Sequence, residues 1–269
     1  MVVVAHPGDE AFGFGGAIAS AAASGAYVVV VCATRGFFDP RLLDPAPAPG
    51  GRNRSYMKPV VWRNLDTVRE DEMRRSVALL GVRVLRMLDY ADGELPSVKP
   101  DELVSRIVEP IRMHRPEVIL TFGSDGVTRD EDHVTLSAAV TLAFERAGEP
   151  MAYEDDLEED QVAWRAAKLY HLVVPEDQLA AVGAGAPRDY GSPADATVTL
   201  DLGELADLKL AAISRHVSQT GSAGAFSDWP PDARDAYLAT ESYHLVRSNL
   251  PVPAGVEEGP RGGLFEGLA

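Results

Sequence analysis

The first ten residues, MVVVAHPGDE (residues 1–10), carry the clearest fold signal in the chain. The valines read as a short buried strand, and the run ends abruptly at a His-Pro-Gly turn. The Ala-rich stretch Phe14–Ser24 is compatible with a helix, and Gly25 supplies a helix stop. Tyr27–Ala33 is a second continuous apolar run, typical of a strand covered on both faces. This order predicts a βαβ unit, hence a parallel sheet with a right-handed crossover.

The rest of the chain repeats this alternation of helix and strand. Further helices are predicted at Val68–Leu80, Asp101–His114, Asp132–Ala147 and Glu204–His216, and further strands at Val84–Leu88, Glu117–Phe122 and Lys168–Val174. The predicted fold class is α/β, with a Rossmann-like parallel sheet flanked by helices and a smaller C-terminal extension.

Gly- and Pro-rich stretches and charge runs along the chain predict its division into a domain, loops and a tail. We expect a single α/β domain over residues 1–250 and a Gly- and Pro-rich tail over residues 251–269. Phe37–Pro59 has no periodicity and reads as a long functional or disordered loop. The acidic run Glu154–Asp160 is interpreted as a solvated face, and Val182–Ala194 as a loop.

Composition excludes several classes of partner. The chain has 269 residues and a net charge of −16, which argues against nucleic acid and anionic membranes as partners. No apolar stretch approaches the ~20 residues of a membrane helix, and no basic region precedes the first valines, so a cytoplasmic location is expected. The single cysteine, Cys32, excludes an intramolecular disulfide and a Cys-rich metal site. A monomer and a homo-oligomer both stay open.

Candidate metal ligands follow two predicted strands. His6 and Asp9 lie just past the first strand, and His133 lies beyond the strand Glu117–Phe122. Ligands of open parallel sheets gather outside the carboxyl ends of the strands. One histidine at a strand end is more often a structural residue, but two histidines with a carboxylate form the ligand set of many catalytic zinc sites. We therefore predict Zn²⁺, or another divalent metal, bound by these three residues, in a site suited to amide hydrolysis.

Several motifs strengthen this hypothesis. Ala5-His6-Pro7-Gly8-Asp9-Glu10 closely resembles the AHPDDE signature of the PIG-L/LmbE-like N-deacetylases. Further segments resemble family motifs in the family's order through most of the chain: Arg69–Glu72 with Leu80-Gly81, Leu88–Gly93, Arg115–Phe122, Asp132-His133, His216–Gln219 and Leu264–Leu268.

The resemblance implies an N-deacetylase acting on a small-molecule amino-sugar conjugate. Members of the family act in mycothiol, bacillithiol, glycolipid-anchor and antibiotic pathways. By carry-over, His6, Asp9 and His133 would be the metal ligands. Arg69 is a candidate to bind a sugar hydroxyl or phosphate, with a helix-surface arginine as the alternative. His216 is a candidate substrate-binding or supporting residue, by resemblance only.

Two departures from the family pattern bear on mechanism. The first Asp of HPDDE, which in the family is the usual general base, is replaced by Gly8. The first His of the family's HxDH motif, which acts as acid or stabilises the oxyanion, is replaced by Asp130. General acid–base groups each contribute about 10²–10⁴-fold to rate.

Three hypotheses account for these departures. In the first, another carboxylate has taken over as base, with Asp130 and Asp132 as the first candidates and Glu10 or Glu131 as less favoured ones. Alternatively, the metal site serves another reaction or substrate. In the third, the chain is a metal- or sugar-binding protein that catalyses no reaction.

The glycine cluster Gly13-Phe14-Gly15-Gly16 has a simpler interpretation than nucleotide binding. It lacks the Gly-Lys-Ser/Thr of a phosphate loop and the spacing of the dinucleotide fingerprint. Close packing of a helix on a strand explains it better.

Overall fold

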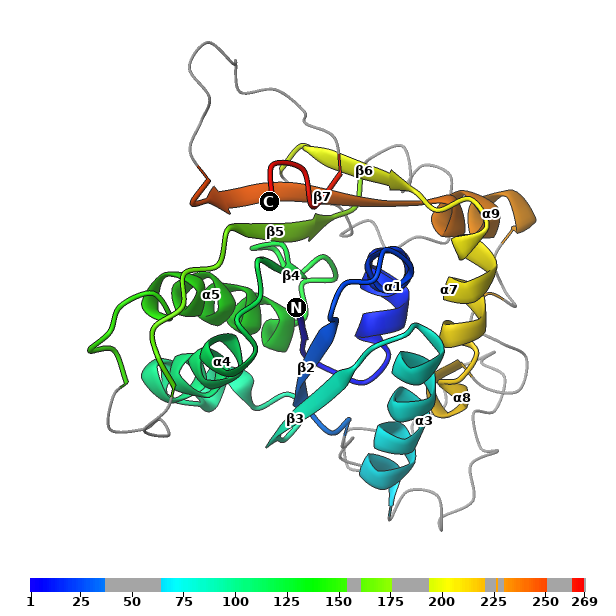
Figure 1. The fold of residues 1–269 in the computed structure, drawn as a ribbon. Coiled ribbons are helices and arrows are strands. Elements are labelled where there is room, and N and C mark those ends of the chain that lie inside the picture. Colours follow the sequence, from blue (N-terminus) through cyan, green and yellow to red (C-terminus); the bar gives the residue numbers. More distant parts are fainter. Residues whose placement is uncertain are drawn as a thin grey trace.

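A computed structural model gives the fold of the chain (Figure 1). It describes residues 1–36, 64–153, 161–175, 194–220, 226, 230–250 and 263–268. The predicted loop Phe37–Pro59, the acidic run Glu154–Asp160, most of Val182–Ala194 and residues 251–262 of the predicted tail lie outside these ranges.

A seven-stranded, mostly parallel sheet forms the centre of the fold, in the order β3-β2-β1-β4-β5-β7-β6. Its strands are β1 (Val2–Val4), β2 (Val29–Thr34), β3 (Val84–Tyr90), β4 (Val118–Phe122), β5 (Lys168–Val173), β6 (Val198–Asp201) and β7 (Thr240–Ser248). Every pair from β3 through to β5 is parallel, whereas β7 runs antiparallel to both of its neighbours. The valines of β1 and β2 are all buried, as expected for strands covered on both faces.

Helices cover both faces of the sheet (Figure 1). They are α1 (Asp9–Ala23), α3 (Leu65–Leu79), the 3₁₀ turn η2 (Leu95–Ser97), α4 (Pro100–His114), α5 (Glu131–Arg146), α7 (Leu205–Ile213), α8 (Val217–Thr220) and α9 (Pro231–Ala239). Helices α4 and α5 pack together on one side, and α1, α3 and α7 pack together on the other. In the described part of the chain, no helix combines the length and apolar character needed to cross a membrane.

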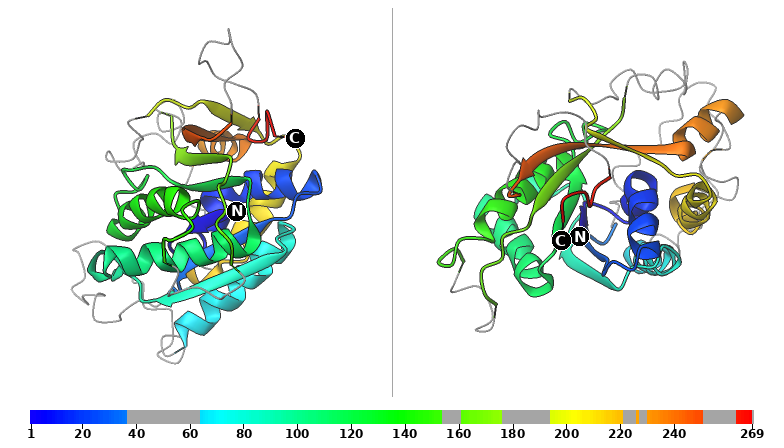
Figure 2. Two further views of the ribbon diagram at one scale, coloured as in Figure 1. Left: turned by 60° about the vertical axis from the view of Figure 1, so that its left-hand side comes forward. Right: turned by 45° about the horizontal axis from the view of Figure 1, so that its top comes forward.

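The predicted α/β class and parallel sheet are confirmed, and the structure adds elements at the C-terminal side. Helix α1 begins at Asp9, five positions before the predicted start, so that Asp9 belongs to its first turn. β6, α9 and β7 were not predicted. Figure 2 shows β7 as a long strand that leads from α9 across the sheet. It escaped prediction because its buried positions include Glu241 and Ser242, which break the apolar pattern.

Glu241 explains the glycine cluster of α1. Its carboxylate accepts hydrogen bonds from the backbone N–H groups of Gly16 and Ala17 at 2.7 and 2.8 Å. It also forms a buried ion pair with Lys209 at 2.9 Å. A bulky side chain on this face of α1 would keep β7 and α7 away from the helix backbone. The predicted packing role of the glycines is confirmed, against helix α7 as well as the sheet.

Residues 263–268 return to the domain. Leu264 is buried in the core, and its carbonyl accepts a hydrogen bond from Lys168 Nζ at 3.4 Å. Lys168 Nζ also donates to the carbonyl of Glu266 at 2.5 Å. A buried ammonium needs hydrogen-bond acceptors. The carbonyls of this short segment supply them to Lys168 at the start of β5.

The helix packing gives a stability prediction. A Cβ at Gly16 would lie 2.3 Å from Leu202 Cδ2 and 3.0 Å from Glu241 Cδ. We expect Gly16→Ala to lower the free energy of unfolding by about 1–3 kcal/mol through overpacking, despite the better helix propensity of alanine. Urea unfolding measures this. Gly15→Ala is the matched control, because the nearest atom to a Cβ there would be Lys209 Cγ at 3.2 Å. Equal losses in the two variants would contradict the packing argument.

Candidate metal centre and active site

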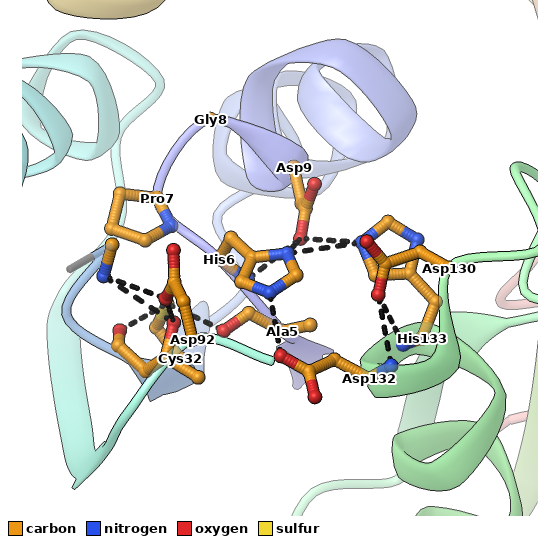
Figure 3. Close-up of polar contacts among 12 residues, drawn as sticks. Ala5, His6, Pro7, Gly8, Asp9, Cys32, Asp92, Asp130, Asp132 and His133 are labelled. Atoms are coloured by element: carbon orange, nitrogen blue, oxygen red, sulfur yellow. Dashed lines mark hydrogen bonds and ion pairs between the residues drawn. The ribbon is translucent and has the colours of Figure 1, made fainter. Parts of the chain in front are cut away.

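The predicted ligands meet at the carboxyl edge of the sheet (Figure 3). His6 follows β1, Asp9 begins α1, and His133 lies in the first turn of α5, just after the loop that leaves β4. Because β1 and β4 are neighbouring parallel strands, their carboxyl ends lie side by side. The topology thus brings together residues that are 127 positions apart.

Three side-chain atoms form a tight triangle. His6 Nδ1 lies 3.2 Å from His133 Nε2, and Asp9 Oδ2 lies 3.6 Å from the first nitrogen and 3.4 Å from the second. Zinc binds nitrogen and oxygen at about 2.0–2.1 Å in a tetrahedron, and that geometry sets neighbouring ligand atoms about 3.3 Å apart. The donor set and its spacing therefore fit a zinc ion, with coordination positions left for water and substrate.

Asp132 supports His6 from behind. His6 Nε2 donates to Asp132 Oδ2 at 2.9 Å, which directs Nδ1 toward the triangle. Asp132 is buried and also accepts backbone hydrogen bonds from Gly93 at 2.6 Å and Leu95 at 3.0 Å. This carboxylate–histidine pairing is the usual outer support of a metal-binding imidazole. The structure brings Asp132 to the ligand, and not to the open side of the site.

His133 is supported by the loop before α5. Its Nδ1 donates to the carbonyl of Gly126 at 3.0 Å, which leaves Nε2 free to face the triangle. The ring also stacks on Phe122, with centroids 4.0 Å apart. The same Gly126 carbonyl accepts the N–H of Thr128 at 2.7 Å, closing a γ-turn around Val127, whose φ is +64°. A β-branched residue in this region is strained, and such strain concentrates at functional sites.

The charges of the triangle are mutually compensating. Burial opposes protonation of His6, but the hydrogen bond to Asp132 and the charge of Asp9 outweigh it and raise its pKa to about 9. Burial likewise opposes protonation of His133, and Asp9 again raises its pKa. Burial would raise the pKa of Asp9, but the two histidines hold it below its usual value. The raised pKa values of both histidines show that the surrounding carboxylates favour positive charge at this point.

Asp130 lies at the rim of this triangle. It is the N-cap of α5, and its Oδ1 accepts the N–H groups of Asp132 and His133 at 2.8 and 3.4 Å. A carboxylate oxygen of Asp130 lies within 4.8 Å of ring nitrogens of both His6 and His133. The side chain is exposed, unlike that of Asp132. Of the two predicted catalytic carboxylates, only Asp130 faces the accessible side of the site.

His216 and Glu10 brace the loop between the ligands. His216 is fully buried, and its Nε2 lies 2.7 Å from Glu10 Oε1. Glu10 Oε2 in turn accepts the backbone N–H of Gly8 at 2.8 Å. His216 thus reaches the loop through Glu10, and its position does not open to a substrate.

Arg69 and Asp92 line the site beyond His6. Arg69 donates to the carbonyl of Gly36 at 2.8 Å and lies 3.5 Å from Asp92 Oδ2. Asp92 accepts hydrogen bonds from the Thr34 hydroxyl and from the backbone N–H of Gly36. Burial raises the pKa of Asp92, against the opposing charge of His6. Arg69 Nε is buried and has no hydrogen-bond partner among the described residues.

Comparison with known proteins identifies the family. The family model described as PIG-L, GlcNAc-PI de-N-acetylase, matches residues 1–144, more than half of the chain. The chain belongs to the PIG-L family. It is therefore a member of a family of deacetylases, hydrolases that cleave an amide.

Relatives and solved structures agree with this membership. The chain is 29% identical to a 1D-myo-inositol 2-acetamido-2-deoxy-α-D-glucopyranoside deacetylase of Streptomyces griseus, covering 100% of this chain and 88% of the relative. Its fold is similar to that of the N,N'-diacetylchitobiose deacetylase of Pyrococcus horikoshii, with a TM-score of 0.68 and 21% identity over 91% of this chain and 82% of the other. A 4-carboxy-2-hydroxymuconate hydratase of Pseudomonas putida shares the fold at a TM-score of 0.59 and 18% identity, over 93% of this PIG-L chain and 97% of the other.

Several residues around the site have contacts that the sequence pattern does not predict. Asp92 and Gln219 lie within motifs that were recognised, but the motif alone does not show what each side chain contacts. Glu72 is a third case. It is buried, and its two oxygens accept hydrogen bonds from the backbone N–H and hydroxyl of Ser218, which ties α3 to α8. A charged residue on the inward-facing side of the predicted helix is the sequence signal that could have identified it.

The pKa of His6 predicts how the metal-free protein responds to pH. Its folded-state pKa of about 9 lies above the ordinary value of 6.5, so protonated His6 stabilises the fold fully below pH 6.5. That contribution is lost as the pH rises through about 9. We expect urea unfolding in the presence of a chelator to show declining stability over this window. His6→Asn should flatten the decline, and an unchanged profile in that variant would contradict the assignment.

The support of His6 by Asp132 predicts a metal-affinity effect. Asp132→Asn keeps the shape of the side chain but removes the charge that orients His6 Nε2. Loss of such outer partners lowers metal affinity by about 10–100-fold. A competition titration with a zinc-binding dye measures this. Glu131→Gln, on the neighbouring exposed residue, is the control, and equal affinities for the two variants would be evidence against the pairing.

Proposed function

We propose that this protein is a metal-dependent N-deacetylase that removes the acyl group from an N-acylated amino-sugar conjugate. The observation that carries the proposal is the triangle of His6 Nδ1, Asp9 Oδ2 and His133 Nε2, whose separations of 3.2–3.6 Å fit one zinc ion. Family membership supports the amide as the bond that is cleaved. The relative in Streptomyces griseus, named for an acetamido-glucopyranoside of inositol, supports the sugar conjugate as substrate class.

The residues divide into ligands, supports and a proton acceptor. His6, Asp9 and His133 would hold the metal, and Asp132 and the Gly126 carbonyl orient the two imidazoles. A zinc ion held there would lower the pKa of bound water to about 7 and would polarise the substrate carbonyl. The protein groups around it then have to take one proton from water and return one to the departing amine.

Asp130 is our candidate for that proton transfer. Only its Oδ1 is engaged by the backbone of α5, and the side chain is exposed at the rim of the site. Asp132, in contrast, accepts three hydrogen bonds from His6, Gly93 and Leu95, and is buried. We therefore assign Asp132 to positioning, and we place the base that Gly8 cannot supply at Asp130.

Arg69 and Asp92 form the proposed sugar-binding wall. The pair offers donors and acceptors close together, which suits the adjacent hydroxyl groups of a sugar. We expect the reaction to take place in the cytoplasm.

The base assignment predicts the behaviour of one variant. Asp130→Asn should lower kcat/KM by about 10²–10⁴-fold, because the amide cannot accept a proton. Asparagine caps a helix as well as aspartate does, so α5 and bound metal should be retained. Metal content and unfolding are measured alongside the rate. Full activity in Asp130→Asn would contradict the assignment, and loss of metal would show that Asp130 is a ligand.

A substrate panel tests the function itself. The zinc-loaded protein is incubated with N-acetylglucosaminyl-inositol, N,N'-diacetylchitobiose and N-acetylglucosamine, and free amine and acetate are quantified. We expect both products in equal amounts from at least one conjugate, and no products from a His6→Ala/His133→Ala variant. The hydratase that shares this fold shows that the fold alone does not set the reaction. Metal binding without amine release from any of these compounds would overturn the proposal.

A further inference from the structure

The space over Gly8 is occupied by a side chain from elsewhere in the chain. Gly8 has a φ of +110°, a conformation that residues with a Cβ rarely adopt. A Cβ built there would lie 2.5 Å from Gln219 Oε1 and 3.2 Å from Gln219 Cδ and Nε2. The carboxamide of Gln219 therefore fills the place where a side chain at position 8 would begin.

Hydrogen bonding fixes which way this carboxamide faces. Gln219 Nε2 donates to the carbonyl of Pro7 at 2.7 Å, a bond that only the NH₂ end of the amide can make. Oε1 is then directed over Gly8. Among the described residues no donor reaches Oε1, and Gln219 is exposed. A free acceptor thus lies next to the loop whose two ends are His6 and Asp9.

The element that carries Gln219 is firmly attached. Ser218 is bound by Glu72 through both its backbone N–H and its hydroxyl. His216 is bound to Glu10, which also accepts the N–H of Gly8. Two connections therefore join the loop between His6 and Asp9 to the segment that carries Gln219. One runs from the Gly8 N–H through Glu10 to His216, and the other from the Pro7 carbonyl to Gln219 Nε2. Gln219 Oε1 has a defined position relative to the metal ligands, which is what a positioning residue needs.

We propose that Gln219 is a substrate-positioning residue, whose Oε1 accepts a hydrogen bond from the amide N–H or a hydroxyl of the N-acylated sugar. This inference rests on the proposed function. A carboxamide cannot take a proton, so Gln219 acts on binding and not as the base. The attachment of the loop uses only Nε2, which leaves Oε1 for a ligand. Figure 3 shows Gly8 at the start of α1 and the proposed base, Asp130, at the start of α5.

Two substitutions separate the acceptor from the anchor. Gln219→Met keeps the length of the side chain and removes both the acceptor Oε1 and the Nε2 donor to the Pro7 carbonyl. Gln219→Glu keeps an acceptor oxygen and removes the donor to Pro7. Gln161→Met is the matched control, because Gln161 lies outside the site and its amide has no hydrogen-bond partner among the described residues. Metal content and unfolding are measured for each variant, since a purely structural role would appear there.

The closing experiment measures binding and turnover with the zinc-loaded protein and N-acetylglucosaminyl-inositol. We expect Gln219→Met to weaken calorimetric binding and raise KM about tenfold, or 1.4 kcal/mol, with kcat, its pH profile and metal content unchanged. Gln219→Glu should retain most of the affinity. Equal binding by Gln219→Met and wild type, or a loss of metal that parallels the loss of binding, would overturn this inference alone. Failure of the wild-type protein to bind or cleave any of the three compounds of the substrate panel would overturn the proposed function, and this inference with it.

A second arm tests the contact without any sugar. Gly8→Ala should lower zinc affinity, because its Cβ would collide with the carboxamide and move the loop between His6 and Asp9. In a Gln219→Ala background the collision is gone, so the same Gly8→Ala change should cost less affinity. Additive effects of the two substitutions would contradict the proposed packing of Gln219 on Gly8.

Discussion

The crowding of His6, Asp9 and His133 at one sheet edge is the constraint on which the rest of the site depends. Three polar atoms within 3.6 Å of one another must share protons or a cation, because burial penalises each charge taken alone. Several surrounding contacts hold that arrangement in place. Asp132 and the strained turn at Gly126 orient the two imidazoles, and Glu10 holds the N–H of the loop between the ligands.

Gly8 stands where the family pattern has an Asp, whereas the proposed ligands His6, Asp9 and His133 are all present. The turn has a glycine conformation, and the space above it belongs to Gln219. A proton acceptor therefore has to come from another element, and the exposed N-cap of α5 is where the structure places a carboxylate beside the ligands. On this account the α1 side of the site binds substrate, and the α5 side moves protons.

The fold and the convergence of His6, Asp9 and His133 could be predicted because each depends on a local pattern. Valine runs mark buried parallel strands, and residues just past such strands meet at one edge whatever the loops between them do. Roles that depend on side-chain direction could not be predicted in this way. Asp130 and Asp132 are two residues apart, yet one is exposed at the rim and the other is buried against His6. β7 was missed because Glu241, which holds Lys209 and the amides of α1, makes a core strand look polar.

Metal stoichiometry tests the central claim most directly. The protein is freed of metal, reloaded with Zn²⁺ at neutral pH, passed through a desalting column and assayed for zinc per chain. The account predicts one zinc per wild-type chain, and none in a folded His6→Ala/His133→Ala variant whose circular dichroism matches the wild type. The same zinc content in both proteins would contradict the assignment of the site, as would a wild-type protein that retains none.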